Sequence, residues 1–251
     1  MEQYRIEHDL LGEKKVPIDA YYGIQTQRAL ENFPITGYRP HKELILAMVM
    51  VKKAAALANM QLGKLDKKRA DAIIRAADEI LSGQFLDQFV VDVIQGGAGT
   101  SLNMNVNEVI ANRAIEILGG KKGDYTLISP NSHVNMSQST NDVFPTAVRI
   151  AILKLVKSLL AELEHLHEAL LKKSEEFDDV IKMGRTHLQD AVPIRLGQEF
   201  GAYARVINRD LHRIKTASEA LKEVNIGATA VGTGLNAQIE YIESTIENLR
   251  K

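Results

Sequence analysis

The stretch ILKLVKSLLAELEHLHEAL, residues 152–170, decides the fold. Its apolar residues recur at alternating spacings of four and three residues, at Ile152, Val156, Leu159, Leu163, Leu166 and Leu170. This heptad pattern is typical of helices that pack along a common seam, and it returns at Phe200, Ala204, Ile207, Leu211, Ile214, Ser218 and Leu221. We therefore expect two long antiparallel helices of roughly 30 residues, each about 45 Å long. One pair cannot bury both faces of such seams, so we expect a bundle shared between subunits.

The chain before this stretch predicts shorter helices. Apolar spacing indicates helices over residues 41–60, 66–83 and about 101–118. Asp66 is the expected N-cap of the second helix, and Gly83 is its expected left-handed end. The first forty residues predict an irregular segment with one short helix near residues 21–30, because proline and glycine interrupt the pattern repeatedly. Pro145 is expected in the first turn of the long helix, where its missing amide hydrogen costs little.

The expected fold is therefore all-α. A mostly helical N-terminal domain is expected over residues 1–140, and the start of a central bundle of long helices over residues 141–251. The chain ends inside a helical pattern, which suggests a piece of a longer protein.

Composition limits the classes of function. The 31 basic and 32 acidic residues among 251 give a formal charge of -1, so no overall field attracts nucleic acid or an anionic membrane. No run approaches the roughly 18 apolar residues that a membrane-spanning helix needs. The absence of cysteine excludes thiolate chemistry and fits a cytoplasmic protein. Aromatic residues make up only 5% of the chain, which favours a small aliphatic ligand over a stacked base.

Two segments place small hydroxyl residues where a helix is expected to begin. The first runs from Gly96 to Ser101, and the second from Ser137 to Asp142. Free amides at a helix N-terminus favour an anion, and Thr100, Ser101, Ser139 and Thr140 would add hydroxyl donors. Capping is the alternative: Thr100 or Ser101 would cap the first helix, and Thr140 or Asp142 the second. Together the segments suggest a small acid with several negative charges as the ligand.

A third segment, Arg185-Thr186-His187, is expected in a loop between the two long helices. Only the imidazole of His187 can exchange a proton near neutral pH, so His187 is the candidate acid or base, or a carboxylate ligand. A hydrogen-bonded structural histidine is the alternative. A nucleophilic pair of Ser139 and His187 is disfavoured because no Gly-x-Ser-x-Gly elbow is present. No metal-binding motif is visible, so we expect neither a metal nor another cofactor.

These segments together resemble the aspartase/fumarase superfamily of lyases. The resemblance spans nearly the whole chain and rests on four blocks in order: GGAGTSLNMNVNE at residues 96–108, SPNSHVNMSQSTND at 129–142, MGRTHLQD at 183–190 and GATAVGTGLN at 227–236. The Gly-Ala-Gly-Thr-Ser and Ser-Thr-Asn sequences within these blocks are more similar to the ammonia-lyase members than to the fumarases. By itself, the fourth block could line a cavity or form a tight turn.

The resemblance implies a reaction and a set of residues. The implied reaction is the reversible deamination of L-aspartate to fumarate and ammonia through an aci-carboxylate, in a homotetramer with sites shared between subunits. The implied substrate-binding residues are Thr100, Ser139, Thr140, Asn141, Thr186 and His187.

The resemblance also leaves alternatives open. The family's signature Gly-Ser-Ser-x-x-Met-Pro-x-Lys-x-Asn, which carries the catalytic base, does not occur in these 251 residues. We therefore expect this polypeptide to hold the binding part of a site and to have little turnover. Fumarate hydratase is the alternative activity, and a non-catalytic helical assembly module is the alternative without chemistry.

Overall fold

The computed structural model describes residues 3–97 and 99–250. Ala98 of the glycine-rich segment and Lys251, the end of the expected second domain, lie outside the described residues. The predicted all-α class is confirmed, with two small β-hairpins as additions. The chain forms two compact units: residues 1–151 with 224–251 make unit 1, and residues 152–223 make unit 2. The expected boundary at residue 140 concerned the domains of a longer family member and stays a prediction.

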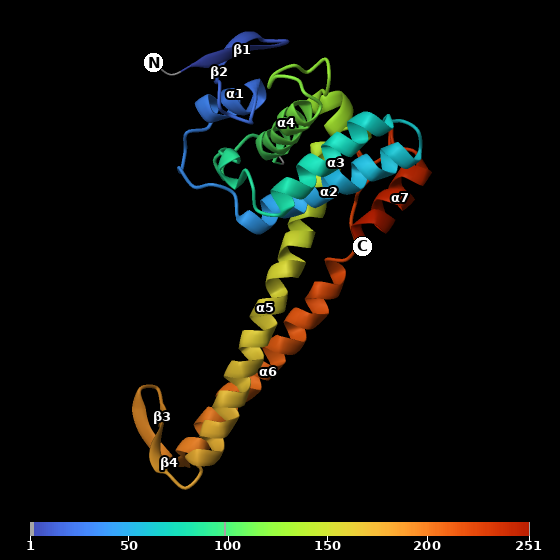
Figure 1. Cartoon of the computed structure of the whole chain (residues 1–251). Helices are drawn as coiled ribbons and strands as arrows, with labels where there is room; N and C mark the ends of the chain where they lie inside the picture. Colours follow the sequence, from blue (N-terminus) through green and yellow to red (C-terminus); the bar gives the residue numbers. More distant parts are fainter. Residues whose placement is uncertain (1–2, 98, 251) are drawn as a thin grey trace. The chain divides into compact units, whose positions relative to one another are not determined.

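Unit 1 is built around three packed helices. Its elements are β1 (Tyr4–Asp9), β2 (Gly12–Pro17), α1 (Ile24–Asn32), α2 (Lys42–Gln61), α3 (Lys67–Leu81), the short 3₁₀ helix η1 (Leu86–Gln88), α4 (Thr100–Ile117), the π-helical turn η2 (Pro130–Val134), the start of α5 (Thr140–Glu176) and α7 (Ile239–Arg250) (Figure 1). No helix in the described part of the chain is long and apolar enough to span a bilayer.

The predicted helices are confirmed, together with their end signals. Asp66 caps α3, because its carboxylate accepts a hydrogen bond from the Arg69 amide at 3.0 Å. Gly83 follows α3 at φ +103°, and Gly119 follows α4 at φ +84°, both in the left-handed region that glycine adopts without strain. The ends of these helices are therefore set by local sequence.

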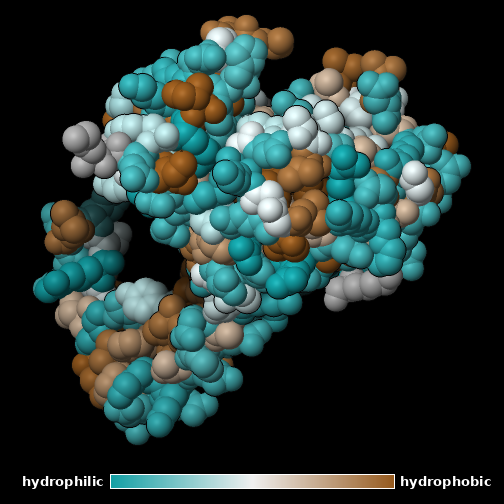
Figure 2. All heavy atoms as spheres, turned by 45° about the horizontal axis from the view of Figure 1, so that its top comes forward, coloured by the Kyte–Doolittle hydropathy of each residue, from teal (hydrophilic) through white to brown (hydrophobic). Residues whose placement is uncertain are grey.

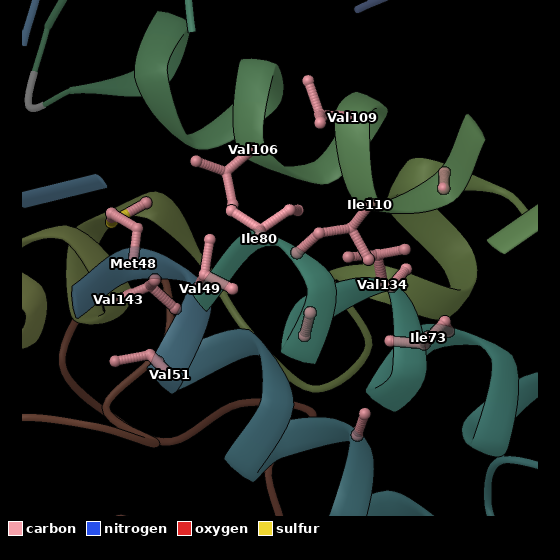
Figure 3. Packing of buried hydrophobic residues seen from close by; sticks show 14 of the residues in the cluster. Met48, Val49, Val51, Ile73, Ile80, Val106, Val109, Ile110, Val134 and Val143 are labelled. Atoms are coloured by element: carbon pink, nitrogen blue, oxygen red, sulfur yellow. The ribbon is translucent and has the colours of Figure 1, made fainter. Parts of the chain in front are cut away.

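The core of unit 1 lies between α2, α3 and α4. Val49 of α2, Ile80 of α3 and Val106 of α4 are fully buried and face one another (Figure 3). Burying a valine or isoleucine side chain contributes about 1.5–3 kcal/mol. Val143 and Ala147 of α5 belong to the same core. The first turns of α5 are therefore fixed to the most densely packed part of the chain.

The prediction of an irregular N-terminal segment is wrong for residues 4–17. They form an antiparallel hairpin in which Tyr4 pairs with Pro17 and Asp9 with Gly12. The pattern gave no strand signal because the hairpin's buried contacts are largely polar. The Arg5 guanidinium donates to the carbonyl oxygens of Pro17, Ala20 and Tyr22. Among the apolar side chains of the hairpin, Val16 is buried, whereas Tyr4, Ile6, Leu10 and Leu11 stay exposed.

The expectation for Pro145 also needs correction. Pro145 lies inside α5, beyond its first turn, where it removes the hydrogen bond that would reach the Asn141 carbonyl. Asn225 compensates, since its side-chain amide donates to that carbonyl oxygen at 3.1 Å. The lost helix bond is thus replaced by a contact with a segment 84 residues away.

Unit 2 is a helical hairpin with a β-hairpin at its turn (Figure 1). The later part of α5 runs beside α6 (Leu196–Ala220), and β3 (Ile181–Thr186) and β4 (Gln189–Arg195) lie between them in sequence. Ser174 Oγ donates to the Gly197 carbonyl at 2.7 Å, and His167 Nδ1 lies 2.9 Å from the Ala204 carbonyl oxygen. A side chain at Gly197 would overlap the backbone of α5, so glycine permits this close approach.

The predicted seam of α6 is confirmed, since all seven of its members, including Leu221 just after the helix, are half-buried or buried. The α5 seam is only partly correct. Val156, Leu163 and Leu170 are half-buried, but Ile152, Leu159 and Leu166 are exposed. Leu153, Leu160 and His167 take the places of those three. The exposed leucines contribute to the hydrophobic areas that interrupt an otherwise mostly hydrophilic surface, as in the face shown in Figure 2.

Candidate functional site

A polar hollow of about 660 Å³ lies in unit 1 beside the start of α5. Ten of its fifteen lining residues carry a hydroxyl or a carboxamide group, and no aspartate, glutamate, lysine or arginine is among the described residues that line it. The lining residues are Asn103, Met104, Asn131, Ser132, Asn135, Met136, Ser137, Gln138, Ser139, Thr140, Thr229, Ala230, Val231, Leu235 and Asn236. Such a surface offers neutral hydrogen-bond donors to an anion.

Ser139 and Asp142 form a capping box at the start of α5. Ser139 Oγ accepts from the Asn141 amide at 3.2 Å, and Asp142 Oδ1 accepts from the Ser139 amide at 2.9 Å. The predicted capping role of Asp142 is therefore confirmed, whereas Thr140 is not the cap. Ser139 uses an oxygen lone pair for the cap and keeps its hydroxyl hydrogen for a ligand.

Asp142 also joins two sequence blocks. Its side chain is fully buried, and Oδ2 accepts from the amides of Gly227 and Thr229 at 3.0 Å each. A carboxylate that receives three backbone donors is strongly held. The Ser139 turn and the glycine-rich segment 227–236 are thereby fixed to one side chain.

The segment 227–236 lines the hollow, which was one of the two readings of its sequence. Thr229 and Asn236 adopt φ +58° and +67°, an unusual conformation for residues with a side chain. Asn141 Nδ2 donates to the Ala230 carbonyl at 2.8 Å. The Asn141 side chain, which was predicted to bind substrate, thus holds this segment in place.

The first glycine-rich segment is built differently from its expected form. Gly99 is the N-cap of α4 at φ +90°, so neither Thr100 nor Ser101 caps the helix. A side chain at residue 99 would overlap the Phe144 ring. Thr100 is exposed and Ser101 half-buried, and neither lines the hollow. Asn103 of the next turn does, so α4 reaches the hollow just after the predicted residues.

A buried polar cluster lies below the hollow. Asn135 Oδ1 accepts from Lys52 Nζ at 2.7 Å and from the side-chain amides of Asn103 and Asn107 at 3.3 Å each. Lys52 Nζ also donates to Gln138 Oε1 at 3.0 Å. Burial lowers the pKa of Lys52 to about 7, and the negative charge of Asp142 opposes that shift.

The segment with Thr186 and His187 belongs to unit 2 and is not the expected loop. It forms the tip of the β3–β4 hairpin, where Thr186 pairs with Gln189 across a two-residue turn. His187 and Leu188 have φ +49° and +60°, and both are exposed. A side chain at Gly184 would lie 2.7 Å from the Val192 carbonyl oxygen, so this glycine permits the strands to pair.

The sequence prediction missed Lys52, Asn103, Asn135, Gln138 and Asp142 as parts of this region. Lys52 gave a signal, since it is a charged residue within the apolar run of α2. Asn103 gave one too, because Asn103 and Asn107 lie four residues apart on α4 within a run of apolar positions, where polar residues would normally face solvent. Nothing in the local sequence indicated that Asp142 would accept hydrogen bonds from the distant segment 227–236 as well as cap α5.

The all-α fold is that of a helical lyase. A family model described as Lyase matches residues 12–251, and the chain belongs to this family, within the aspartase/fumarase superfamily. It is 64% identical to aspartate ammonia-lyase of Bacillus subtilis over 99% of the chain and 52% of that relative. It is also 54% identical to the class II fumarate hydratase of Halobacterium salinarum, over 97% of the chain and 52% of that relative.

A solved structure supports the same fold. The fumarate lyase:delta crystallin of Brucella melitensis superimposes with a TM-score of 0.94 at 52% identity, over 98% of this chain and 54% of that one. The chain thus spans about half the length of the relatives that it matches.

Proposed function

We propose that the protein is a carbon–nitrogen lyase that converts L-aspartate to fumarate and ammonia. The observation that carries the proposal is the hydroxyl- and amide-lined hollow at the Ser139 turn, in a chain similar to aspartate ammonia-lyases. A dicarboxylate with an amino group is small and carries charges that this lining can satisfy. The hollow is large enough for it, since binding pockets generally start at about 300 Å³.

The chemistry explains why neutral donors suit the task. A base removes a proton from the carbon next to the β-carboxylate, and that carboxylate gains a second negative charge as an aci-carboxylate. The carbon–nitrogen bond then breaks, the double bond of fumarate forms, and ammonia leaves. Preorganised donors that meet the developing charge lower the barrier. We assign this role to the hydroxyls of Ser139 and Thr140.

The remaining predicted residues complete the proposal. We assign Thr100, Ser101 and Asn141 to substrate binding, and Thr186 and His187 to a site completed by several subunits of a cytoplasmic homotetramer. In it, His187 is the acid/base or carboxylate-binding group. The exposure of the hairpin tip supports this assignment, because an exposed imidazole is free to reach another subunit.

The base itself is assigned elsewhere. The signature Gly-Ser-Ser-x-x-Met-Pro-x-Lys-x-Asn does not occur in this sequence. We therefore expect the 251-residue polypeptide to show little turnover, and activity to require that signature. Activity restored by adding only residues upstream of it would contradict this expectation.

Fumarate hydratase is the second candidate, and the similarity to the Halobacterium enzyme favours it. The two activities share fumarate and differ in whether ammonia or water leaves. The test is fumarate release by the complete gene product, followed by ultraviolet absorbance, with L-aspartate and L-malate offered separately at equal concentration. Release from aspartate alone supports the proposal, and release from malate alone replaces it with the hydratase.

A matched pair of variants connects the activity to the hollow. Thr140→Val removes a hydroxyl at the lining with almost no change in shape, and kcat/KM is expected to fall at least about 10²-fold. Thr216→Val is the control, because the Thr216 hydroxyl bonds only to its own helix at the His212 carbonyl on an exposed face. Equal activity in the two variants would contradict the assignment of Thr140.

A further inference from the structure

Lys52 is a buried cation that the proposed chemistry does not use. It lies in the middle of α2 with 0% of its surface exposed, among valines and alanines. Its neighbour Lys53 is partly exposed and pairs with Asp78 on the surface of the unit. Both hydrogen-bond partners of Lys52, within the described part of the chain, are neutral amide oxygens. Burying an ammonium group without a directly bonded carboxylate is unfavourable, so a hydrophobic side chain would stabilise this position better.

The two acceptors belong to one turn. Asn135 and Gln138 flank the turn that leads into Ser139, and both line the hollow. The turn is also held within itself, since Asn135 Nδ2 donates to the Gln138 carbonyl at 3.2 Å and Gln138 Nε2 donates to the Val134 carbonyl at 3.0 Å. Lys52 therefore binds the two side chains at the ends of a turn that is also held by hydrogen bonds within itself.

This turn is strained and needs support. Ser137 has φ +61°, a left-handed conformation that is unfavourable for a residue with a side chain. Its hydroxyl donates to Asn59 Oδ1 at 3.0 Å, and Asn59 Nδ2 donates to the Met136 carbonyl at 3.1 Å. Lys52 and Asn59 both come from α2, so this helix holds the turn from below at two points seven residues apart.

We propose that Lys52 is a positioning residue that fixes the Asn135–Gln138 turn, and through it the hydroxyls of Ser139 and Thr140, for the substrate. The inference deepens the proposed function and rests on it for the identity of the substrate. Lys52 is buried beneath the turn, and so acts through Asn135 and Gln138. A neutral amine keeps two N–H donors for two acceptors, so this role does not require the positive charge.

The test compares Lys52→Met with Lys53→Met in the complete gene product. Methionine retains the length and apolar stem of lysine and removes the donors. The same substitution one residue later removes only a surface ion pair. With L-aspartate as substrate, Lys52→Met is expected to raise KM and lower kcat, for a loss of at least tenfold in kcat/KM per folded molecule. Lys53→Met is expected to match the wild type. Normal kcat/KM in folded Lys52→Met protein would overturn the proposal.

A second measurement separates positioning from general stability. Amide hydrogen exchange of peptides that cover residues 135–142 is expected to be at least tenfold faster in Lys52→Met than in Lys53→Met, with α3 peptides unchanged. Unchanged exchange, or an equal increase throughout unit 1, would overturn the proposal. If Lys52→Met does not fold, Lys52→Gln, which retains a neutral donor, takes its place. Failure of both to fold would assign Lys52 to folding alone.

The exchange measurement also distinguishes this inference from the proposed function. If the wild type releases fumarate from neither aspartate nor malate, the proposed function fails. Faster exchange at residues 135–142 alone would then still support Lys52 as the residue that fixes this turn.

Discussion

The start of α5 in unit 1 and the tip of the β3–β4 hairpin in unit 2 carry predicted site residues in opposite settings. Around Ser139, the buried Asp142 accepts three backbone amides and the buried Lys52 holds the preceding turn. At the hairpin tip, His187 and Leu188 are exposed in left-handed conformations, and Leu188 is 100% exposed. One set of residues is fixed by its own chain, and the other is presented outward.

The two regions differ in whether the support of their site residues lies within this chain. Residues with a buried support have their geometry fixed within this chain. Two left-handed residues with side chains at a hairpin turn cost about 1–2 kcal/mol each, and nothing within the described part of unit 2 compensates by burying them. We expect that compensation to come from another subunit. Substitutions should therefore affect stability in the first region and activity alone in the second.

The largest effect on stability is expected for Asp142→Asn. Asparagine leaves one carbonyl oxygen for three amide donors and turns an N–H group toward at least one of them. We expect the free energy of unfolding to fall by about 4 kcal/mol, as for a buried charge network that loses a partner. Urea denaturation followed by circular dichroism measures it.

Asp71→Asn is the matched control for Asp142→Asn. Asp71 pairs with Lys67 on an exposed face of α3, and such pairs contribute little. We expect a change within about 0.5 kcal/mol. If both variants lose the same stability, Asp142 is not a clamp and the contrast between the two regions disappears.

The next effect is expected for Gly99→Ala. Alanine would be strained at φ +90° and its Cβ would overlap the Phe144 ring, so we expect a loss of about 3 kcal/mol. Gly83→Ala measures the backbone strain alone, because Gly83 has φ +103° and no atom lies within 4 Å of the added carbon. It should lose about 1 kcal/mol. Equal losses in thermal or urea unfolding would mean that Phe144 moves aside freely.

Helix positions were predictable from the sequence where local signals set them. Asp66, Gly83 and Gly119 act at the ends of their own helices, and the α6 seam is a simple repeat. The N-terminal hairpin was not predictable from apolar alternation, because Val16 is its buried apolar side chain and its other buried contacts come from Arg5 and Glu7. The β3–β4 hairpin was read as a loop because Gly184 and Pro193 interrupt it, yet glycine is what permits that pairing.

The candidate site likewise contains residues that local sequence predicts and residues that it does not. Hydroxyls at a helix start identified Ser139 and Thr140, which line the hollow. The partners of Asp142 lie about 85 residues away in sequence, so no local pattern could identify the clamp. The same holds for Lys52 and Asn135, which meet across 83 residues.

A smaller effect is expected from the titration of Lys52. Its pKa in the folded protein is about 7, below the ordinary value of 10.5. Between these values the unfolded chain holds a proton that the folded chain has released, so the free energy of unfolding rises with pH in this window. The rise is at most about 1.4 kcal/mol per pH unit. Below this pH window, Lys52 adds no pH dependence, because it is protonated in both the folded and the unfolded chain. Urea unfolding at pH 6 to 9 should show this rise in wild type and in Lys53→Met, and Lys52→Met should lack it.

The smallest effect on stability is expected for His187→Asn. Asparagine tolerates the left-handed conformation at φ +49°, and the imidazole is exposed, so the free energy of unfolding should change by less than about 0.5 kcal/mol. In the complete gene product, kcat/KM for aspartate should nevertheless fall at least about 10²-fold, because asparagine can neither transfer a proton nor present an imidazole to a substrate carboxylate. Asp190→Asn is the control, since it removes only the exposed pair with Arg185. A destabilised His187→Asn protein would show that the hairpin tip is structural, and normal activity would remove His187 from the site.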